Sequence, residues 1–240
     1  ARRTYLGRYQ SAARHVVQLH STTSRNQPLI EEKKNRSPTV IVIDDDESVR
    51  EALRGLFESV GLIAETHGSV KEFVAADDPE KAGCIVLDIR LPGQSGLEFQ
   101  EALAQSDLPR SVVLISAHVD VAMAVRAMKA GAIDVLTKPV REQDLLEAVN
   151  RAIANDAIRR LERTTKATIQ TSYTSLTERE RQIMALVIAG KLNKQIAAEL
   201  QLAEPTVKLH RGHMMQKMKA TSVAHLVKMA EGLKGCRGLS

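Results

Sequence analysis

Aromatic side chains are scarce in this sequence. Its 240 residues include no Trp, three Tyr and three Phe, and Tyr173 is the last aromatic residue along the chain. Proteins that bind RNA or single-stranded DNA commonly stack the bases on aromatic side chains. The scarcity of aromatic residues therefore argues against a stacking platform of this kind.

Cysteines and long apolar segments are scarce as well. The two cysteines, Cys84 and Cys236, lie far apart, and no secretory signal is recognisable at the N-terminus. We therefore expect reduced thiols in a cytoplasmic protein. No apolar run approaches the roughly 18 residues that span a bilayer, so no membrane partner is expected. The hydrophobic content of 43% fits a globular protein, and the length allows two modest domains.

Charge is distributed unevenly along the chain. Residues 37–150 carry twenty Asp/Glu against ten Lys/Arg, whereas residues 151–240 carry sixteen Lys/Arg against seven Asp/Glu. A metal site followed by a domain that binds a phosphate backbone would produce this asymmetry, and so would two solvated surfaces of unlike charge. The charges alone leave both interpretations open.

Residues 1–38 fit neither half of the chain. They are rich in Arg, Ser and Thr, and they carry no acidic residue before Glu31. This composition is similar to that of an organellar transit peptide, and equally to a disordered basic arm or to a product of an upstream start. We favour a dispensable N-terminal arm.

Residues 39–155 alternate short apolar runs with amphipathic stretches. The apolar runs are 39–43, 62–66, 84–87, 112–115 and 133–136, and their lack of polar alternation is typical of strands covered on both faces. Helical periodicity lies between them, and a last helix begins near Glu142 and runs toward Arg160. Five such units predict an α/β domain with a doubly wound, flavodoxin-like parallel sheet of five strands.

The rest of the chain follows a different pattern. Residues 161–175 are Thr-rich, weakly apolar and aperiodic, and we interpret 156–175 as a linker. Residues 176–240 predict an all-α domain of four short helices. Thr177 and Glu180 have the spacing of a capping box, and Pro205 stands in the first turn of the third helix.

Acidic, hydroxyl and ammonium groups follow four of the predicted strands. Asp44, Asp45 and Asp46 follow the first strand, and Asp88, Ser116 and Lys138 come at the ends of later ones. Ligands of open parallel sheets bind beyond the carboxyl ends of the strands. Crowded carboxylates need a cation, and Mg²⁺ prefers such oxygen ligands. A carboxylate can accept a phosphoryl group whose charge a metal, a lysine and a hydroxyl stabilise. A single Asp at a strand end more often caps a helix, which is the role we expect for Asp46.

Four segments, VIVIDDDESVREAL, CIVLDIRLPGQSGLEF, VVLISAHVD and GAIDVLTKP, resemble the signature regions of response-regulator receiver domains. The resemblance covers residues 39–155. It implies that Asp88 is the phosphorylated aspartate, that Asp45, Asp88 and the backbone carbonyl of Arg90 bind Mg²⁺ directly, that Asp44 binds it through water, that Ser116 and Lys138 contact the phosphoryl group, and that Pro139 follows a cis peptide bond.

Two positions bear on alternatives to this reading. The family usually has Tyr or Phe where this chain has Val135, three residues before the lysine, and that aromatic side chain takes part in the switch. Val135 therefore leaves open a receiver that acts without phosphorylation. An aspartyl-phosphate enzyme of the haloacid-dehalogenase type would need an Asp two residues after the nucleophile, where this chain has Arg90. We therefore expect no enzyme activity beyond the receiver's own phosphorylation and dephosphorylation.

The segments LTERE, GKLNKQIAAEL and TVKLHR resemble the LuxR-type helix-turn-helix of FixJ/NarL response regulators. The two motif helices would span about 192–211. On the third helix of the domain, helical spacing predicts a buried stripe of Val207, Met214 and Met218. Glu178 would tie helices together, and Ala203 replaces a frequent Ser cap. The positions expected at DNA are Lys194, Thr206, Lys208, Leu209, His210 and Arg211. A four-helix module that binds protein remains the alternative.

The fourth helix, at 222–231, has apolar residues at helical spacing: Val223, Leu226, Val227 and Ala230. Core packing explains some of them, and the resemblance adds a dimer contact on the outer part of this face. The whole chain is thus similar to a transcriptional response regulator in which the unphosphorylated receiver masks the DNA-binding domain. The implied partners are a sensor histidine kinase, double-stranded promoter DNA, a second copy on phosphorylation, and RNA polymerase.

Overall fold

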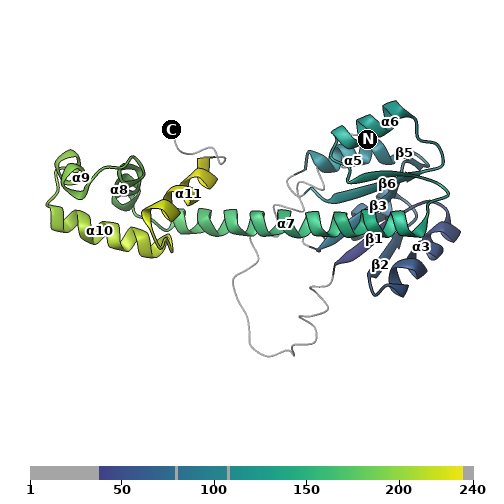
Figure 1. Ribbon diagram of the computed structural model, residues 1–240, viewed down its shortest axis with the longest axis horizontal. Coiled ribbons are helices and arrows are strands. Elements are labelled where there is room, and N and C mark those ends of the chain that lie inside the picture. The colour runs from purple at the N-terminus through teal and green to yellow at the C-terminus, as the bar shows by residue number, and fades with distance from the viewer. Residues whose placement is uncertain (1–37, 79–80, 107–108, 235–240) are drawn as a thin grey trace. The chain divides into compact units, whose positions relative to one another are not determined.

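The computed structural model describes residues 38–78, 81–106 and 109–234, and the expected N-terminal arm lies outside them apart from its last residue. The chain forms two compact units, which divide between Ile158 and Arg159 (Figure 1). Among the described residues, no helix combines the length and apolar character that a membrane span requires.

The first unit is built around a main sheet of five strands, with a small antiparallel pair beside it. Each of the five main strands begins and ends within one residue of its expected range. In chain order the elements are β1 (Thr39–Ile43), α3 (Glu47–Ser59), β2 (Ile63–His67), α4 (Val70–Ala76), β3 (Gly83–Asp88), β4 (Arg90–Leu91), β5 (Gln94–Ser95), α5 (Gly96–Ala104), β6 (Ser111–Ser116), α6 (Val121–Lys129), β7 (Asp134–Thr137) and α7 (Glu142–Thr174).

The main sheet has the order β2-β1-β3-β6-β7 and is parallel throughout, which confirms the predicted doubly wound α/β fold. Alternate residues of a strand face opposite sides of the sheet. Val40 and Val42 accordingly pack in a core with residues of α3 and α7. Ile41 and Ile43 pack in a second core with residues of α4, α5 and α6. Both faces of the sheet are therefore covered, as the apolar strands predict.

The aperiodic linker expected at 156–175 is wrong as a description of the backbone, because α7 is a single helix of 33 residues that ends at Thr174. Each residue added to an existing helix gains a hydrogen bond without a new nucleation cost. The threonine hydroxyls fit this helix: Thr168 Oγ1 donates to the carbonyl of Thr164, and Thr171 Oγ1 to that of Ala167. Ile169 and Tyr173 then pack against the core of the second unit.

The second unit contains the four expected helices, α8 (Glu178–Ile188), α9 (Asn193–Leu200), α10 (Glu204–Lys217) and α11 (Val223–Lys234). The predicted capping box opens α8, because the Thr177 side chain accepts from the Glu180 amide and the Glu180 side chain accepts from the Thr177 amide. The three residues of the predicted buried stripe on α10, Val207, Met214 and Met218, all lie in the core of this unit. The helical domain therefore folds around the apolar pattern seen in the sequence.

Candidate metal centre and nucleic-acid interface

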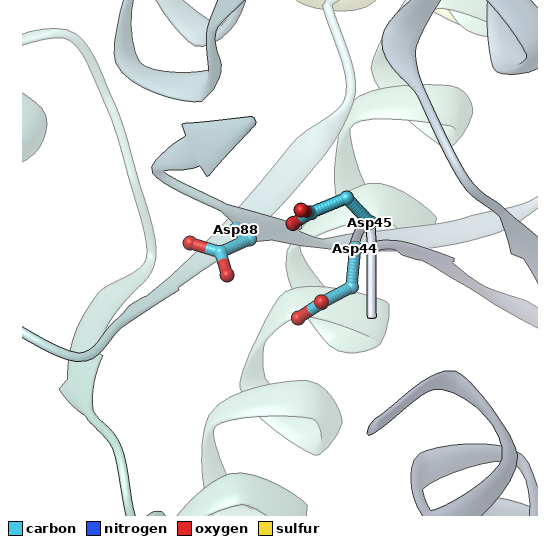
Figure 2. Close-up of side chains that lie close together, drawn as sticks. All are labelled: Asp44, Asp45 and Asp88. Atoms are coloured by element: carbon cyan, nitrogen blue, oxygen red, sulfur yellow. The ribbon is translucent and has the colours of Figure 1, made fainter. Parts of the chain in front are cut away.

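The acidic cluster lies at the carboxyl ends of the central strands. Asp44 and Asp45 follow β1, and Asp88 is the last residue of β3, which pairs with β1 in parallel. Carboxylate oxygens of the three residues all lie within 4.8 Å of one another. Figure 2 shows the Asp44 and Asp45 side chains extending from the end of β1 toward Asp88. The parallel topology thus gathers residues that are 44 positions apart in the sequence.

Lys138 brings a positive charge to this cluster. Its Nζ atom lies 2.6 Å from Oδ2 of Asp44 and 2.6 Å from Oδ2 of Asp88. Burial lowers the pKa of the Lys138 ammonium, but the hydrogen bonds to the two carboxylates outweigh burial and raise it. Burial raises the pKa of Asp44 and outweighs the hydrogen bonds from Lys138 and from the Asp46 amide. The peptide bond between Lys138 and Pro139 is cis, as expected.

The donor set of this cluster fits a divalent cation. Three carboxylates face one ammonium, so the ionised cluster keeps an excess of negative charge. Asp44 and Asp88 are buried, whereas Asp45 is exposed and leaves the cluster open to solvent. Mg²⁺ binds one or two carboxylates in such sites and keeps several waters. Asp46 is directed elsewhere, because its side chain accepts from the amides of Ser48 and Val49 and caps α3, as predicted.

Two further predicted residues lie beside Asp88. Ser116, the last residue of β6, is fully buried, and its hydroxyl donates to the carbonyl of His118 across 3.2 Å. Arg90, in β4, donates its backbone amide to Oδ1 of Asp88 across 2.9 Å. Asp88 therefore has one oxygen held by an amide and the other by Lys138, while a hydroxyl ends the neighbouring strand.

Gly96 packs directly against the backbone of Asp88. Its amide donates to the carbonyl of Ile89 across 2.9 Å. A Cβ atom at position 96 would lie 2.1 Å from the carbonyl oxygen of Asp88, a distance that no side chain can occupy. Glycine at the start of α5 is therefore what allows the loop after β3 to close behind the aspartate.

Val135 occupies the position at which the family usually has an aromatic residue. It lies in β7 opposite Leu114 of β6 and is partly buried against the core on the α4, α5 and α6 side of the sheet. Its short side chain has none of the reach of an aromatic ring. The structure thus places an aliphatic residue at the expected switch position.

Glu180, rather than Glu178, ties the helices of the second unit together. Glu180 is buried, and its Oε2 accepts a hydrogen bond of 2.7 Å from Lys217 of α10. Glu178 is exposed, and its one interaction with the residues that the structure describes is a 3.9 Å ion pair with Arg181, one turn along its own helix. The sequence resemblance pointed to Glu178, but the side chain at 180 faces α10. The long reach of Lys217, which we did not predict, completes the link.

The outward face of α10 carries two of the predicted DNA-contacting residues. Lys208 and Leu209 are exposed, and Lys208 Nζ lies 3.5 Å from Oε1 of Glu204 one turn earlier. Ala203 precedes α10 without a side-chain cap, which agrees with the expected departure from the Ser cap. On α9, Lys194 is exposed near the first turn. The side chains of Lys194, Lys208 and Leu209 are therefore accessible from solvent.

Thr206, His210 and Arg211 are only partly exposed. Arg211 Nη1 donates to Oδ1 of Asn193, the first residue of α9, across 2.7 Å. No motif in the sequence marks Asn193 as the partner of Arg211. Arg211 therefore connects the two motif helices and fixes the start of α9 relative to α10, in addition to its predicted place near DNA.

The expected dimer face of α11 is wrong for two of its four residues. Leu226 is fully buried and Ala230 is 3% exposed, and both belong to the core of their own domain. Helical spacing alone does not separate an inward stripe from an outward one. Val223 is 36% exposed and Val227 is partly exposed, so only these two remain accessible.

Two regions of the chain match known protein families. Residues 40–150 match the response regulator receiver domain, and residues 174–230 match the bacterial regulatory proteins of the luxR family. Nodulation protein W of Bradyrhizobium diazoefficiens is 47% identical over 194 residues, which cover 81% of this chain and 86% of that protein. Transcriptional regulatory protein FixJ of Azorhizobium caulinodans is 39% identical over 191 residues, which cover 80% of this chain and 90% of that protein.

A solved structure shows the same similarity in three dimensions. The structure of the response regulator StyR superimposes with a TM-score of 0.75 at 48% sequence identity. The match covers 81% of this chain and 98% of that one. The similarity therefore extends over both units of the chain.

Proposed function

Since the chain belongs to the response-regulator family, with a receiver domain followed by a LuxR-type DNA-binding domain, we propose that a sensor histidine kinase phosphorylates Asp88 and thereby controls promoter binding. The observation that carries this proposal is the cluster of three carboxylates, two of which accept hydrogen bonds from Lys138. Because its target is DNA, we place the protein in the cytoplasm, with RNA polymerase as its downstream partner.

The residues at the strand ends divide the chemistry among them. A carboxylate oxygen of Asp88 attacks the donor's phosphorus, and the bond from phosphorus to the donor breaks. Lys138, already within hydrogen-bonding distance of Asp88, pairs with the transferred group. The Ser116 hydroxyl turns from the His118 carbonyl to donate to a phosphoryl oxygen, since hydroxyl groups rotate freely.

The magnesium ligands would be Asp45, Asp88 and the backbone carbonyl of Arg90, with Asp44 acting through water. When bound, Mg²⁺ would stabilise the negative charge on the phosphoryl oxygens during transfer. The fit rests on the convergence of the three carboxylates and on the exposure of Asp45, which leaves space for water ligands. Beyond this self-phosphorylation and its reversal we propose no enzyme activity.

DNA binding is proposed for the outward face of α10, which would lie in the major groove, and for Lys194 on α9. Lys208 and Leu209 are exposed for base contacts, and Thr206, His210 and Arg211 lie beside them. The active species would be a dimer on two half-sites about one helical turn apart. Its outer α11 contacts would be Val223 and Val227.

A second dimer contact is proposed on the receiver. Helix α6 exposes Val121 by 82%, Val125 by 46% and Met128 by 50%, at the spacing of one helical face. Such an apolar stripe is costly in water, and a second copy of the receiver would cover it. Gel filtration of the phosphorylated protein should show a dimer, and Val125→Glu should prevent its formation.

The decisive experiment for the function is phosphorylation by acetyl phosphate with Mg²⁺, followed by intact-mass spectrometry. The wild type should gain one phosphate, and Asp88→Asn should gain none. Equal labelling of the mutant would contradict the assignment of Asp88.

A second candidate function follows from Val135, which lacks the usual aromatic ring. If the missing ring disables the switch, the receiver would serve as a dimerisation module, and the protein would bind DNA without phosphorylation. Gel shifts with and without acetyl phosphate distinguish the two. A clear rise in operator affinity supports phosphorylation control, and equal affinity supports the alternative.

A further inference from the structure

The Asp45 carboxylate lacks side-chain contacts that would fix its orientation within the described part of the chain. Asp44 uses both oxygens, since Oδ1 accepts from the Asp46 amide and Oδ2 from Lys138. The Asp45 side chain is exposed and forms no hydrogen bond or ion pair with the residues that the structure describes. The direction in which Asp45 points is therefore set by its backbone.

The side chain of Arg50 binds the backbone of Asp44 and Asp45. Its Nη1 atom donates to the carbonyl oxygen of Asp44 and to that of Asp45, each across 2.9 Å. Hydrogen bonds from a charged donor are about twice as strong as neutral ones. Arg50 lies in the first turn of α3, whose N-terminus is capped by Asp46. The guanidinium thus extends back along the turn at residues 44–46 and links the carbonyls of Asp44 and Asp45 to the helix.

From this arrangement we propose that Arg50 is a positioning residue for magnesium: it fixes the Asp44–Asp45 backbone so that the Asp45 carboxylate is directed at the metal. The proposal rests on the proposed function of the acidic cluster. Groups that orient metal ligands contribute strongly to affinity, and their loss commonly weakens binding by about 10- to 100-fold. Arg50 would act only on the binding of the metal, whereas Lys138 acts on the phosphoryl group and Asp88 takes part in both.

The chain offers a matched control on the same helix. Arg54, one turn after Arg50, donates to the Glu51 carboxylate and to the Thr66 hydroxyl. Within the described part of the chain, it forms no hydrogen bond or ion pair with residues 44–46. Arg50→Met and Arg54→Met remove the same charge and the same donors from neighbouring turns of α3. A difference between them then reports on the carbonyl contacts and not on loss of an arginine.

The experiment measures Mg²⁺ binding to the unphosphorylated full-length protein by titration calorimetry. Acetyl phosphate labelling then gives the Mg²⁺ concentration for half-maximal rate. Arg50→Met should weaken Mg²⁺ binding about tenfold and raise that concentration in parallel. Its labelling rate at saturating Mg²⁺ should stay within about twofold of the wild type, and Arg54→Met should match the wild type in both. If Arg50→Met fails to fold, Arg50→Gln, which is too short to reach the carbonyls, should show the same loss.

A double-mutant cycle tests whether Arg50 affects Mg²⁺ affinity by way of the Asp45 carboxylate. In an Asp45→Asn background, Arg50→Met should cause little further loss of Mg²⁺ affinity. The inference is overturned if folded Arg50→Met binds Mg²⁺ like the wild type, or if its effect persists undiminished without the Asp45 carboxylate. If the wild type itself neither binds Mg²⁺ nor accepts phosphate, the proposed function fails instead.

Discussion

Lys138 donates a hydrogen bond of 2.6 Å from Nζ to Oδ2 of Asp88. The same nitrogen bonds to Asp44, so one ammonium group lies between carboxylates from two neighbouring strands. It offsets part of the repulsion that a bound metal ion would also relieve. The lysine and the metal should therefore compensate for each other in their effect on stability.

Replacing Lys138 with Met should destabilise the metal-free protein by about 1–3 kcal/mol, because two carboxylates lose their hydrogen-bond donor. Mg²⁺ should restore more stability to this variant than to the wild type. Thermal unfolding with and without Mg²⁺ measures both effects. Lys71→Met, at an exposed site on α4, serves as the control. If metal-free Lys138→Met melted at the same temperature as the metal-free wild type, this prediction would be contradicted.

The Glu180–Lys217 bond should make the stability of the DNA-binding domain depend on pH. Burial would raise the pKa of the Glu180 carboxyl, but the hydrogen bonds from Lys217 and Thr177 outweigh burial and lower it. A lowered pKa means that the ionised form stabilises the fold at neutral pH. That contribution is lost as the pH falls from about 4.3, the ordinary glutamate value, through the lower pKa of the folded state.

Glu180→Gln should therefore cost about 1–3 kcal/mol at pH 7, and the difference from the wild type should shrink in acid. Hydrogen exchange of α8 and α10 in the full-length protein follows this domain specifically. Glu178→Gln is the matched control, since Glu178 is exposed. A Glu180→Gln penalty that stays constant down to pH 3 would argue against an ionised Glu180 as its source.

Lys208 and Lys194 should contribute to DNA binding in different ways. Lys208 lies near the N-terminus of α10, where we expect it to contact a base edge, and such a contact carries roughly 1–3 kcal/mol of discrimination. Lys194 lies in the first turn of α9, where we expect it to contact the phosphate backbone. Lys208→Ala should thus relax specificity at one base pair of each half-site. Lys194→Ala should weaken all DNA binding and reduce the salt slope by about one unit.

Titrations of both lysine variants against operator and scrambled duplex at several salt concentrations measure these differences. Retention of the full specificity ratio by Lys208→Ala would show that the assignment is wrong. The same conclusion would follow if Lys194→Ala changed that ratio.

Gly212 should show a conflict between stability and DNA binding. It is exposed on α10, and a Cβ atom there would meet nothing within 4 Å. Gly212→Ala should stabilise the helix by about 0.5–1 kcal/mol, but it should weaken operator binding if the backbone approaches DNA at this point. Gly232→Ala in α11, where space is equally open, should stabilise without loss of binding. Unchanged operator affinity in both variants would remove Gly212 from the interface.

The acidic cluster was predictable because its positions follow from the backbone. Asp44, Asp88 and Ser116 each stand at a strand end, and parallel strands place their carboxyl ends at one edge of the sheet. The periodicity of apolar residues likewise located the strands to within one residue. These features depend on short side chains and regular elements, which sequence patterns describe well.

Contacts of long side chains were not predictable in this way. Arg50, Lys217 and Arg211 each donate to a group in another turn or helix. Several rotatable bonds separate each charged group from its own backbone. The choice between Glu178 and Glu180 depended on the rotation of α8 against α10. The extent of α7 depended on the packing of Ile169 and Tyr173 against the second core, and two residues are too few to form a recognisable apolar stripe.

The tight contact between Gly96 and the carbonyl of Asp88 has a consequence for genetics. Position 96 has no side chain to take part in a chemical step, yet every other amino acid would displace the loop behind Asp88. A screen for loss of signalling should therefore recover substitutions of Gly96 alongside those of Asp88. Among distant relatives, invariance at this position would record steric exclusion, and it would look the same in an alignment as the invariance of a reactive group.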